Sequence, residues 1–128
     1  MFLTVNRGDN ITWTFLVLDD GDPADLSGIR RIRFTVKNEM DDADSDALIR
    51  LSDETSGVTV LAQSGDTLGQ FEVSLTHADT KTLVTADYRC VFDCQITWND
   101  GSVSTPFMGE FFIAGDVTHN SNTIATDV

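Results

Sequence analysis

The residues best suited to metal chemistry lie in an acidic segment, Asp41-Asp42-Ala43-Asp44-Ser45-Asp46. Carboxylates at alternating positions are typical of the first part of a calcium-binding loop, where their oxygen atoms bind the cation. Such a loop also has glycine at its sixth position and glutamate at its twelfth. Counted from Asp42, these positions hold Ala47 and Asp53. We therefore expect a solvated acidic loop and predict no metal site.

Histidine is the side chain most often used for proton transfer near neutral pH, and the sequence has two, His77 and His119. Neither belongs to a sequence pattern typical of a catalytic triad or a metal centre. The sequence also lacks a glycine-rich phosphate loop, a dinucleotide-binding fingerprint and zinc-type cysteine spacing. We therefore predict no catalytic residues and no cofactor, and we expect the protein not to be an enzyme.

The tripeptide Arg7-Gly8-Asp9 matches a cell-adhesion motif, which acts when a loop displays it. Here it directly precedes a predicted strand, where glycine suits the turn because it tolerates a positive φ angle. A match of three residues also arises readily by chance. We expect a turn at this position and no adhesion site.

The two cysteines, Cys90 and Cys94, fall four positions apart in one predicted strand. At ~3.3 Å per residue, their Cα atoms would be about 13 Å apart. A disulfide bond permits at most about 7 Å. We therefore predict two buried free thiols and no intrachain disulfide.

The chain of 128 residues carries a net charge of −13, from 8 basic and 21 acidic residues. This charge argues against nucleic acid as a partner, since affinity for phosphates depends on basic patches that release counterions. It also argues against anionic membrane surfaces. No apolar run approaches the roughly 20 residues that a membrane-spanning helix requires. The N-terminal residues do not resemble a signal peptide, so we expect synthesis in the cytoplasm.

The elements that position these residues are predicted to be β-strands, because apolar side chains recur at every second position. In the segment 10–18, for example, Trp13 and Phe15 fall on one face, and Thr12 and Thr14 fall on the other. The same alternation predicts strands at 10–18, 30–37, 48–51, 58–61, 70–75, 88–98 and 103–113.

Three local signals mark the ends and bends of these strands. Thr76 and Asp79 form the pattern of a capping box, which predicts one short helical turn. Asn99-Asp100-Gly101-Ser102 is typical of a tight hairpin turn. Pro106 within the last strand predicts an edge position or a bulge, because proline cannot donate a ladder hydrogen bond. The pattern predicts an all-β fold, a two-layer antiparallel sandwich of about seven or eight strands with one short helical turn.

We expect one β-sandwich domain at residues 1–115, followed by an extended arm at 116–128. The arm carries few charges and many residues compatible with β-structure. Such an arm can add a strand to a neighbouring subunit, or it can remain a frayed end. Its candidate docking residues are Val117, Ile124 and Val128.

A second candidate docking surface is the outer face of the strand at 30–37, where Arg31, Arg33 and Lys37 form a basic stripe. On a strongly acidic chain, such a stripe could bind an acidic neighbour or pair with carboxylates on an adjacent strand. The sequence leaves both possibilities open.

Several segments together resemble small structural proteins of tailed bacteriophages. The similarity rests on Arg7-Gly8-Asp9-Asn10-Ile11-Thr12-Trp13-Thr14-Phe15, Asp19-Asp20-Gly21-Asp22-Pro23-Ala24-Asp25-Leu26-Ser27-Gly28, Ile32-Arg33-Phe34-Thr35-Val36-Lys37 and Gly101-Ser102-Val103-Ser104-Thr105-Pro106-Phe107-Met108-Gly109-Glu110-Phe111. Their order is similar to that in the N-terminal domain of baseplate upper proteins and in related virion proteins, and the similarity covers most of residues 6–113. It implies an immunoglobulin-like β-sandwich without catalytic residues.

The resemblance implies a non-enzymatic structural protein of a tailed-phage virion, made in the host cytoplasm. It would act by protein–protein docking as a tail or baseplate adaptor or as a capsid decoration protein. Its partners would be other virion proteins and further copies of itself, because a symmetric assembly multiplies weak contacts. The alternative is a cell-surface adhesion or carbohydrate-binding β-sandwich module, in which the acidic loops bind calcium.

Overall fold

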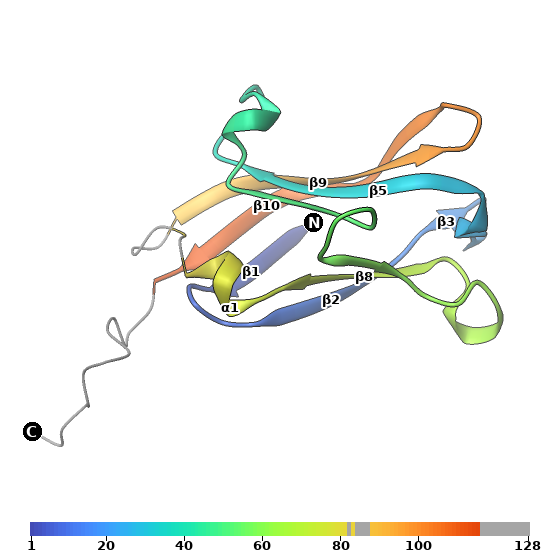
Figure 1. Ribbon diagram of the computed structural model, residues 1–128, viewed down its shortest axis with the longest axis horizontal. Helices are drawn as coiled ribbons and strands as arrows, with labels where there is room; N and C mark the ends of the chain where they lie inside the picture. Colours follow the sequence, from blue (N-terminus) through green and yellow to red (C-terminus); the bar gives the residue numbers. More distant parts are fainter. Residues whose placement is uncertain (82, 84–87, 116–128) are drawn as a thin grey trace, which may run out of the picture.

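The computed structural model describes residues 1–81, 83 and 88–115, and most of them lie in β-strands (Figure 1). The prediction of an all-β protein is confirmed. The strands are β1 (Phe2–Asn6), β2 (Ile11–Leu16), β3 (Leu18–Asp19), β4 (Asp22–Pro23), β5 (Ile29–Lys37), β6 (Ile49–Ser52), β7 (Val58–Val60), β8 (Gln70–Leu75), β9 (Tyr88–Trp98) and β10 (Val103–Ala114). The helical elements are η1 (Leu26–Gly28), η2 (Asp44–Asp46), η3 (Gly65–Thr67) and α1 (His77–Thr80).

Two of the three sheets that the described residues form lie one above the other, as Figure 1 shows, and their buried apolar residues share one core; the third is the two-stranded hairpin β3-β4. One sheet has five strands in the order β1-β10-β9-β5-β6, and the other has three in the order β2-β8-β7. Trp13 of β2 reaches across to the five-stranded sheet, where its ring centroid lies 6.1 Å from that of Phe34 and 5.9 Å from that of Phe111. The strands form because their alternate apolar residues can share this one core.

Strand β1 corrects the expectation of a purely antiparallel fold. It was not among the predicted strands, and it pairs in parallel with β10, with Phe2 opposite Glu110. Its residues alternate as a strand should, with Leu3 and Val5 buried. Its pairing partner, however, lies at the other end of the described chain. A contact at that sequence separation leaves no local signal.

The hairpin of β9 and β10 confirms the predicted turn and the predicted effect of Pro106. The Trp98 amide donates to the carbonyl of Ser102, at 2.8 Å, which closes the turn. The register of β10 against β9 shifts between Ser104 and Phe107, so a bulge accommodates the proline. Strand β1 pairs with β10 only from Glu110 onward, so Pro106 removes no hydrogen bond to β1.

Helix α1 forms at the predicted position through the predicted capping box. The Thr76 hydroxyl accepts a hydrogen bond from the Asp79 amide, and the Asp79 carboxylate accepts one from the Thr76 amide. Thr80 is fully buried, and its hydroxyl donates to the carbonyl of Asp9 at 2.9 Å. These contacts anchor α1 to the turn between β1 and β2.

The two thiols of β9 are free and buried, as predicted. The Cys90 sulfur donates to the carbonyl of Phe111 at 3.2 Å, and burial raises the pKa of Cys90 to about 11. Burial also raises the pKa of Cys94. Both cysteines therefore serve as small core residues that stay protonated at neutral pH.

Among the residues that the structure describes, no helix has the length and apolar character needed to span a membrane. Residues 116–128, which were predicted to form an arm, lie outside the described part of the chain.

Candidate functional site

The candidate site is the outer face of the five-stranded sheet, which faces away from the three-stranded sheet. Burial alternates along β5, where Phe34 is fully buried and its neighbours Arg33 and Thr35 face outward. The register then places Thr35 opposite Asp93 on β9 and Arg50 on β6. Three strands that are far apart in sequence therefore bring charged side chains to one surface.

Four basic side chains gather on this face, and we call them the basic group: Arg31, Arg33, Lys37 and Arg50. The three arginines line a hollow of about 430 Å³ at the outer side of β5 and β6, together with the carboxylates of Asp44 and Glu54. Half of the chain's 8 basic residues are thus concentrated on one surface of a protein with a net charge of −13.

The basic group is only partly neutralised from within the chain. Lys37 forms an ion pair with Asp44 at 2.7 Å, and the Arg31 guanidinium lies 3.9 Å from the Glu54 carboxylate. Within residues 1–81, 83 and 88–115, neither Arg33 nor Arg50 has an ion pair. The structure therefore combines the two possibilities that the sequence left open, because two members pair internally and two remain available.

Asp44 is the carboxylate at the centre of this electrostatic arrangement. The hydrogen bond and charge of Lys37 hold the pKa of Asp44 below its ordinary value, and Arg50 and Arg33 lower the pKa further. The Lys37 ammonium also donates to the carbonyl of Asp42 at 2.9 Å. Part of the acidic segment is therefore tied to β5.

Arg31 has a buried donor atom that its ion pair does not satisfy. Its contact with Glu54 is long, and its Nε atom is buried without a hydrogen-bond partner among the described residues. A buried donor without a partner costs free energy that an added acceptor could recover. The position therefore favours a carboxylate or carbonyl group beside Arg31.

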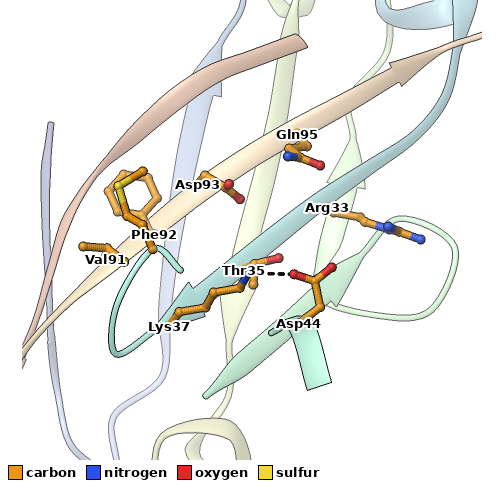
Figure 2. A pocket seen from close by; sticks show the side chains of 9 residues that line it. Arg33, Thr35, Lys37, Asp44, Val91, Phe92, Asp93 and Gln95 are labelled. Carbon is orange, nitrogen blue, oxygen red and sulfur yellow. Dashed lines mark ion pairs between the residues drawn. The ribbon is translucent and has the colours of Figure 1, made fainter. Parts of the chain in front are cut away.

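A second hollow, of about 100 Å³, adjoins the basic group on β5 and β9 (Figure 2). Arg33, Lys37 and Asp44 lie along one side of it, and Asp93 lies on the opposite strand. Burial raises the pKa of Asp93, while Lys37 acts in the opposite direction. Asp93 is therefore a half-buried acid that forms no ion pair among the described residues, and the nearby charge of Asp44 raises its pKa further.

An apolar patch covers the other part of the outer face, on β1, β9 and β10. It consists of Phe2, Val91, Met108 and Phe112. Phe2 is 53% exposed and Met108 is 48% exposed, although both could have been polar at no cost to the core. The rings of Phe2 and Phe112 stack with centroids 6.4 Å apart. The charged Glu110 of β10 lies between Phe2 and Val91 in the register, so the patch is not purely apolar. Exposed apolar side chains that gather on one face typically mark an interaction surface.

The apolar patch and the basic group meet at the smaller hollow. Val91 belongs to the patch, and Met40, which is 61% exposed, lines the same hollow as Val91 and Lys37. The outer face is therefore richer in apolar side chains toward β1 and in basic side chains toward β6. Such a surface can bind a protein segment that carries both apolar and acidic side chains.

The structure brings the three predicted basic residues together, because Arg31, Arg33 and Lys37 share the outer face of β5. The other predicted docking residues lie outside the described part of the chain: Val117, Ile124 and Val128.

Sequence reasoning missed Arg50 and the apolar patch. Arg50 lies in a predicted strand between two buried residues, so its outward position was readable from the alternation. The same holds for Met108 and Phe112, which alternate with the buried Phe111. The signal was therefore present, but only the sheet order places these side chains on one surface.

The Arg7-Gly8-Asp9 tripeptide forms a turn that is fixed by hydrogen bonds. The Arg7 Nε donates to the carbonyl of Leu83 at 3.0 Å, and the carbonyl of Gly8 lies 2.6 Å from the Nδ1 of His77. This carbonyl accepts the hydrogen bond, so Nδ1 carries the proton. The tripeptide and His77 thus act together in holding the turn between β1 and β2.

The acidic segment folds back on itself rather than around a cation. The Asp42 carboxylate accepts a hydrogen bond from the Glu39 amide at 3.1 Å, and Asp44 pairs with Lys37. Across the described ranges, no three His, Cys, Asp or Glu side chains are grouped so that they could hold a metal ion. His119 lies outside those ranges.

Comparison with known proteins gives no match: no protein-family model fits the sequence, and no curated protein matches it significantly. The functional argument therefore depends on the residues and their geometry.

Proposed function

We propose that the protein is a non-enzymatic structural protein that docks to other proteins through the outer face of its five-stranded sheet. The observation that carries this proposal is that exposed apolar side chains around Phe2 and Phe112 share one sheet face with Arg33 and Arg50, which form no ion pair among the described residues. Folding requires neither feature, because the core lies on the opposite side of the same strands. A binding partner would bury the patch and neutralise Arg33 and Arg50.

We further propose that the two sheets form an immunoglobulin-like sandwich and that the protein belongs to the virion of a tailed phage. The sandwich is supported by sheets of five and three strands that enclose one core. The virion assignment is supported by the sequence resemblance and by a docking surface that suits repeated, individually weak contacts. In this role the protein is an adaptor of the tail or baseplate, or a capsid decoration protein.

The non-enzymatic part of the proposal is supported by what the chemically capable side chains do. His77 holds the Gly8 carbonyl through Nδ1, and Cys90 and Cys94 are buried thiols whose pKa values are raised by burial. Each of these groups therefore has a structural task that accounts for its position.

The test uses particles of the phage that encodes the chain. Mass spectrometry of purified particles should detect the protein in a fixed ratio to the major capsid protein. Replacing Arg31→Glu together with Arg33→Glu should lower its incorporation at least about tenfold, because like charges then face an acidic partner. Truncation after Gly115 tests whether residues 116–128 contribute to incorporation.

A matched control makes the same change in net charge away from β5 and β6, with Lys81→Glu, Ala62→Glu and Ala78→Glu. All three residues are exposed and lie outside the five-stranded sheet. This variant should enter particles at the level of the wild-type protein. Particles that lack the protein altogether would contradict the proposed function, and equal losses for both variants would contradict the assigned surface.

A further inference from the structure

The hairpin of β3 and β4 carries a concentrated acidic charge at one end of the two sheets. We call residues 18–23 the acidic finger. Asp19 and Asp22 face each other across its two strands, and Asp20 lies between them in the turn. Like charges directly opposite on paired strands are destabilising. In the described part of the chain, no ion pair relieves the charge of these three aspartates.

The acidic finger is held in one conformation by its base and its turn. The Val17 amide donates to the carbonyl of Gly69 at 2.8 Å, and the Ala24 amide donates to the carbonyl of Val17 at 2.9 Å. Asp20 and Gly21 adopt φ angles of 50° and 86°, which a tight hairpin turn requires. A fixed, projecting hairpin loses little conformational entropy when it binds.

The acidic finger also presents an apolar side chain. Leu18 is 56% exposed at the start of the finger, and Leu16, which precedes it on β2, is 42% exposed. The finger therefore combines exposed leucine with carboxylates, which is the composition that complements an arginine-lined hollow. It lies at the right-hand end of the molecule in Figure 1, away from the outer side of β5 and β6.

From this complementarity we propose that the acidic finger of one copy binds the basic group of a second copy. Asp19 and Asp22 would pair with Arg33 and Arg50 at the larger hollow. The inference rests on the proposed function and names the occupant of this part of the docking surface. One chain carries both partners of this contact, because two arginines of the basic group and the aspartates of the finger form no ion pair among the described residues.

The geometry makes this contact heterologous, because the two complementary surfaces lie on different sides of one molecule. Such contacts are head-to-tail, and they generate rings or open helical arrays rather than closed dimers. A finger of six residues buries less area than a stable dimer interface requires. We therefore expect a dissociation constant on the order of 100 μM for a single contact, which repetition in an array strengthens.

The test is a charge exchange between two variants of the full chain. One variant reverses the finger with Asp19→Lys and Asp22→Lys, and the other reverses the hollow with Arg33→Glu and Arg50→Glu. Sedimentation velocity over a concentration series should show self-association of the wild-type protein and at least about tenfold weaker association of each variant alone. An equal mixture of the two variants should associate again, because a basic finger then meets an acidic hollow.

Two matched controls separate the contact from the effect of net charge. Lys81→Glu with Ala62→Glu and Ala78→Glu copies the charge change of the reversed hollow, and Asp66→Lys with Glu72→Lys copies that of the reversed finger. Both controls should associate like the wild-type protein. Far-ultraviolet circular dichroism and thermal melting confirm that every variant is folded.

The inference is overturned if the wild-type protein stays monomeric at all concentrations, if the mixture fails to associate, or if the controls lose association equally. None of these results would affect the particle experiment. A monomeric protein that still enters particles through Arg31 and Arg33 would identify another virion protein as the source of the acidic segment. In that case the proposed function would stand without this inference.

Discussion

The two faces of the five-stranded sheet are built from alternate residues of the same strands, yet they differ in what constrains them. On the inner face, Phe34 and Phe111 are fully buried and contact each other and Trp13. On the outer face, Arg33 and Phe112 lie beside them in sequence without a comparable role in packing. The core fixes the inner residues, whereas the outer residues are free to serve binding.

Ionisable groups on the two faces show the same contrast. Inside, burial alone raises the pKa of Cys90 to about 11, so the thiol remains neutral. Outside, Lys37 lowers the pKa of Asp44, which therefore stays charged at neutral pH. The outer face thus carries charges that are exposed to solvent, and the binding of a partner through these charges should weaken as the salt concentration rises.

The largest expected effect comes from a truncation on the inner face. Phe34→Ala should lower the free energy of unfolding by about 3–5 kcal/mol, because it removes buried contacts and leaves a cavity in the core. Phe112→Ala on the outer face should lower it by less than about 1 kcal/mol. Urea denaturation of both variants measures the difference. Equal losses would show that the outer face also contributes to the core.

A smaller effect is expected where β1 and β10 lie side by side at the edge of the sheet. A Cβ atom at Gly109 would overlap the carbonyl oxygen of Met1, so Gly109→Ala must displace the residue that precedes β1. We expect a loss of about 1–3 kcal/mol, as is typical of overpacking. Gly28→Ala is the matched control, because a Cβ atom there meets nothing within 4 Å. A thermal melt of Gly109→Ala that matches wild type would contradict this account of β1.

Replacing the half-buried Asp93 should increase the stability of the protein, whereas the two preceding substitutions should decrease it. Because burial raises its pKa, the folded protein binds this proton more tightly than the unfolded chain does, and ionisation reduces stability as the pH rises. Asp93→Asn should therefore increase the free energy of unfolding at pH 7 by up to about 1 kcal/mol, a value limited by solvent screening. The gain should disappear at low pH, where the wild-type carboxyl is protonated.

Asp44→Asn provides the contrasting measurement on the same face. The pKa of Asp44 is lowered by Lys37, so its contribution to stability is present above the ordinary carboxyl pKa and is lost as the pH falls through the lowered value. The variant should be less stable than wild type at pH 7 and equal to it in strong acid. Denaturation curves at both pH values test the two signs together, and a loss for both variants at pH 7 would contradict the assignment.

The smallest effect on stability is expected for Met108→Ser, which removes an exposed side chain from the apolar patch. The free energy of unfolding should change by no more than about 0.5 kcal/mol. Incorporation into particles should nevertheless fall, because the variant removes apolar area from the docking surface. A loss of incorporation without a loss of stability would show that an outer-face residue serves binding and not folding. Normal incorporation of this variant would show that Met108 is not part of the docking surface.

Much of the fold could be predicted from local sequence. The predicted strands 70–75 and 88–98 agree with β8 and β9 at both ends, and the capping box and the bulge at Pro106 were also predicted correctly. Each of these features depends on side chains within a few positions of one another. The parallel pairing of β1 with β10 was missed because its partners are about a hundred residues apart.

In the candidate site, too, local features could be predicted from the sequence and contacts between distant residues could not. The outward direction of Arg31, Arg33 and Lys37 follows from alternation along one strand. Their ion pairs do not, because Asp44 and Glu54 come from loops that were not expected to contact this strand. The position of Arg50 beside them does not follow either, because Arg50 lies on a different strand.

By itself, the sequence determined which residues turn inward, where the chain turns, and that the protein is all-β, because these properties depend on the two-residue period of a strand. Only the tertiary structure decided which strands are neighbours, and therefore which outward side chains form one surface. The physical reason is that hydrophobic burial is non-directional, so alternation selects a face without selecting a partner. Strand order is set when all of the apolar faces are packed into one core.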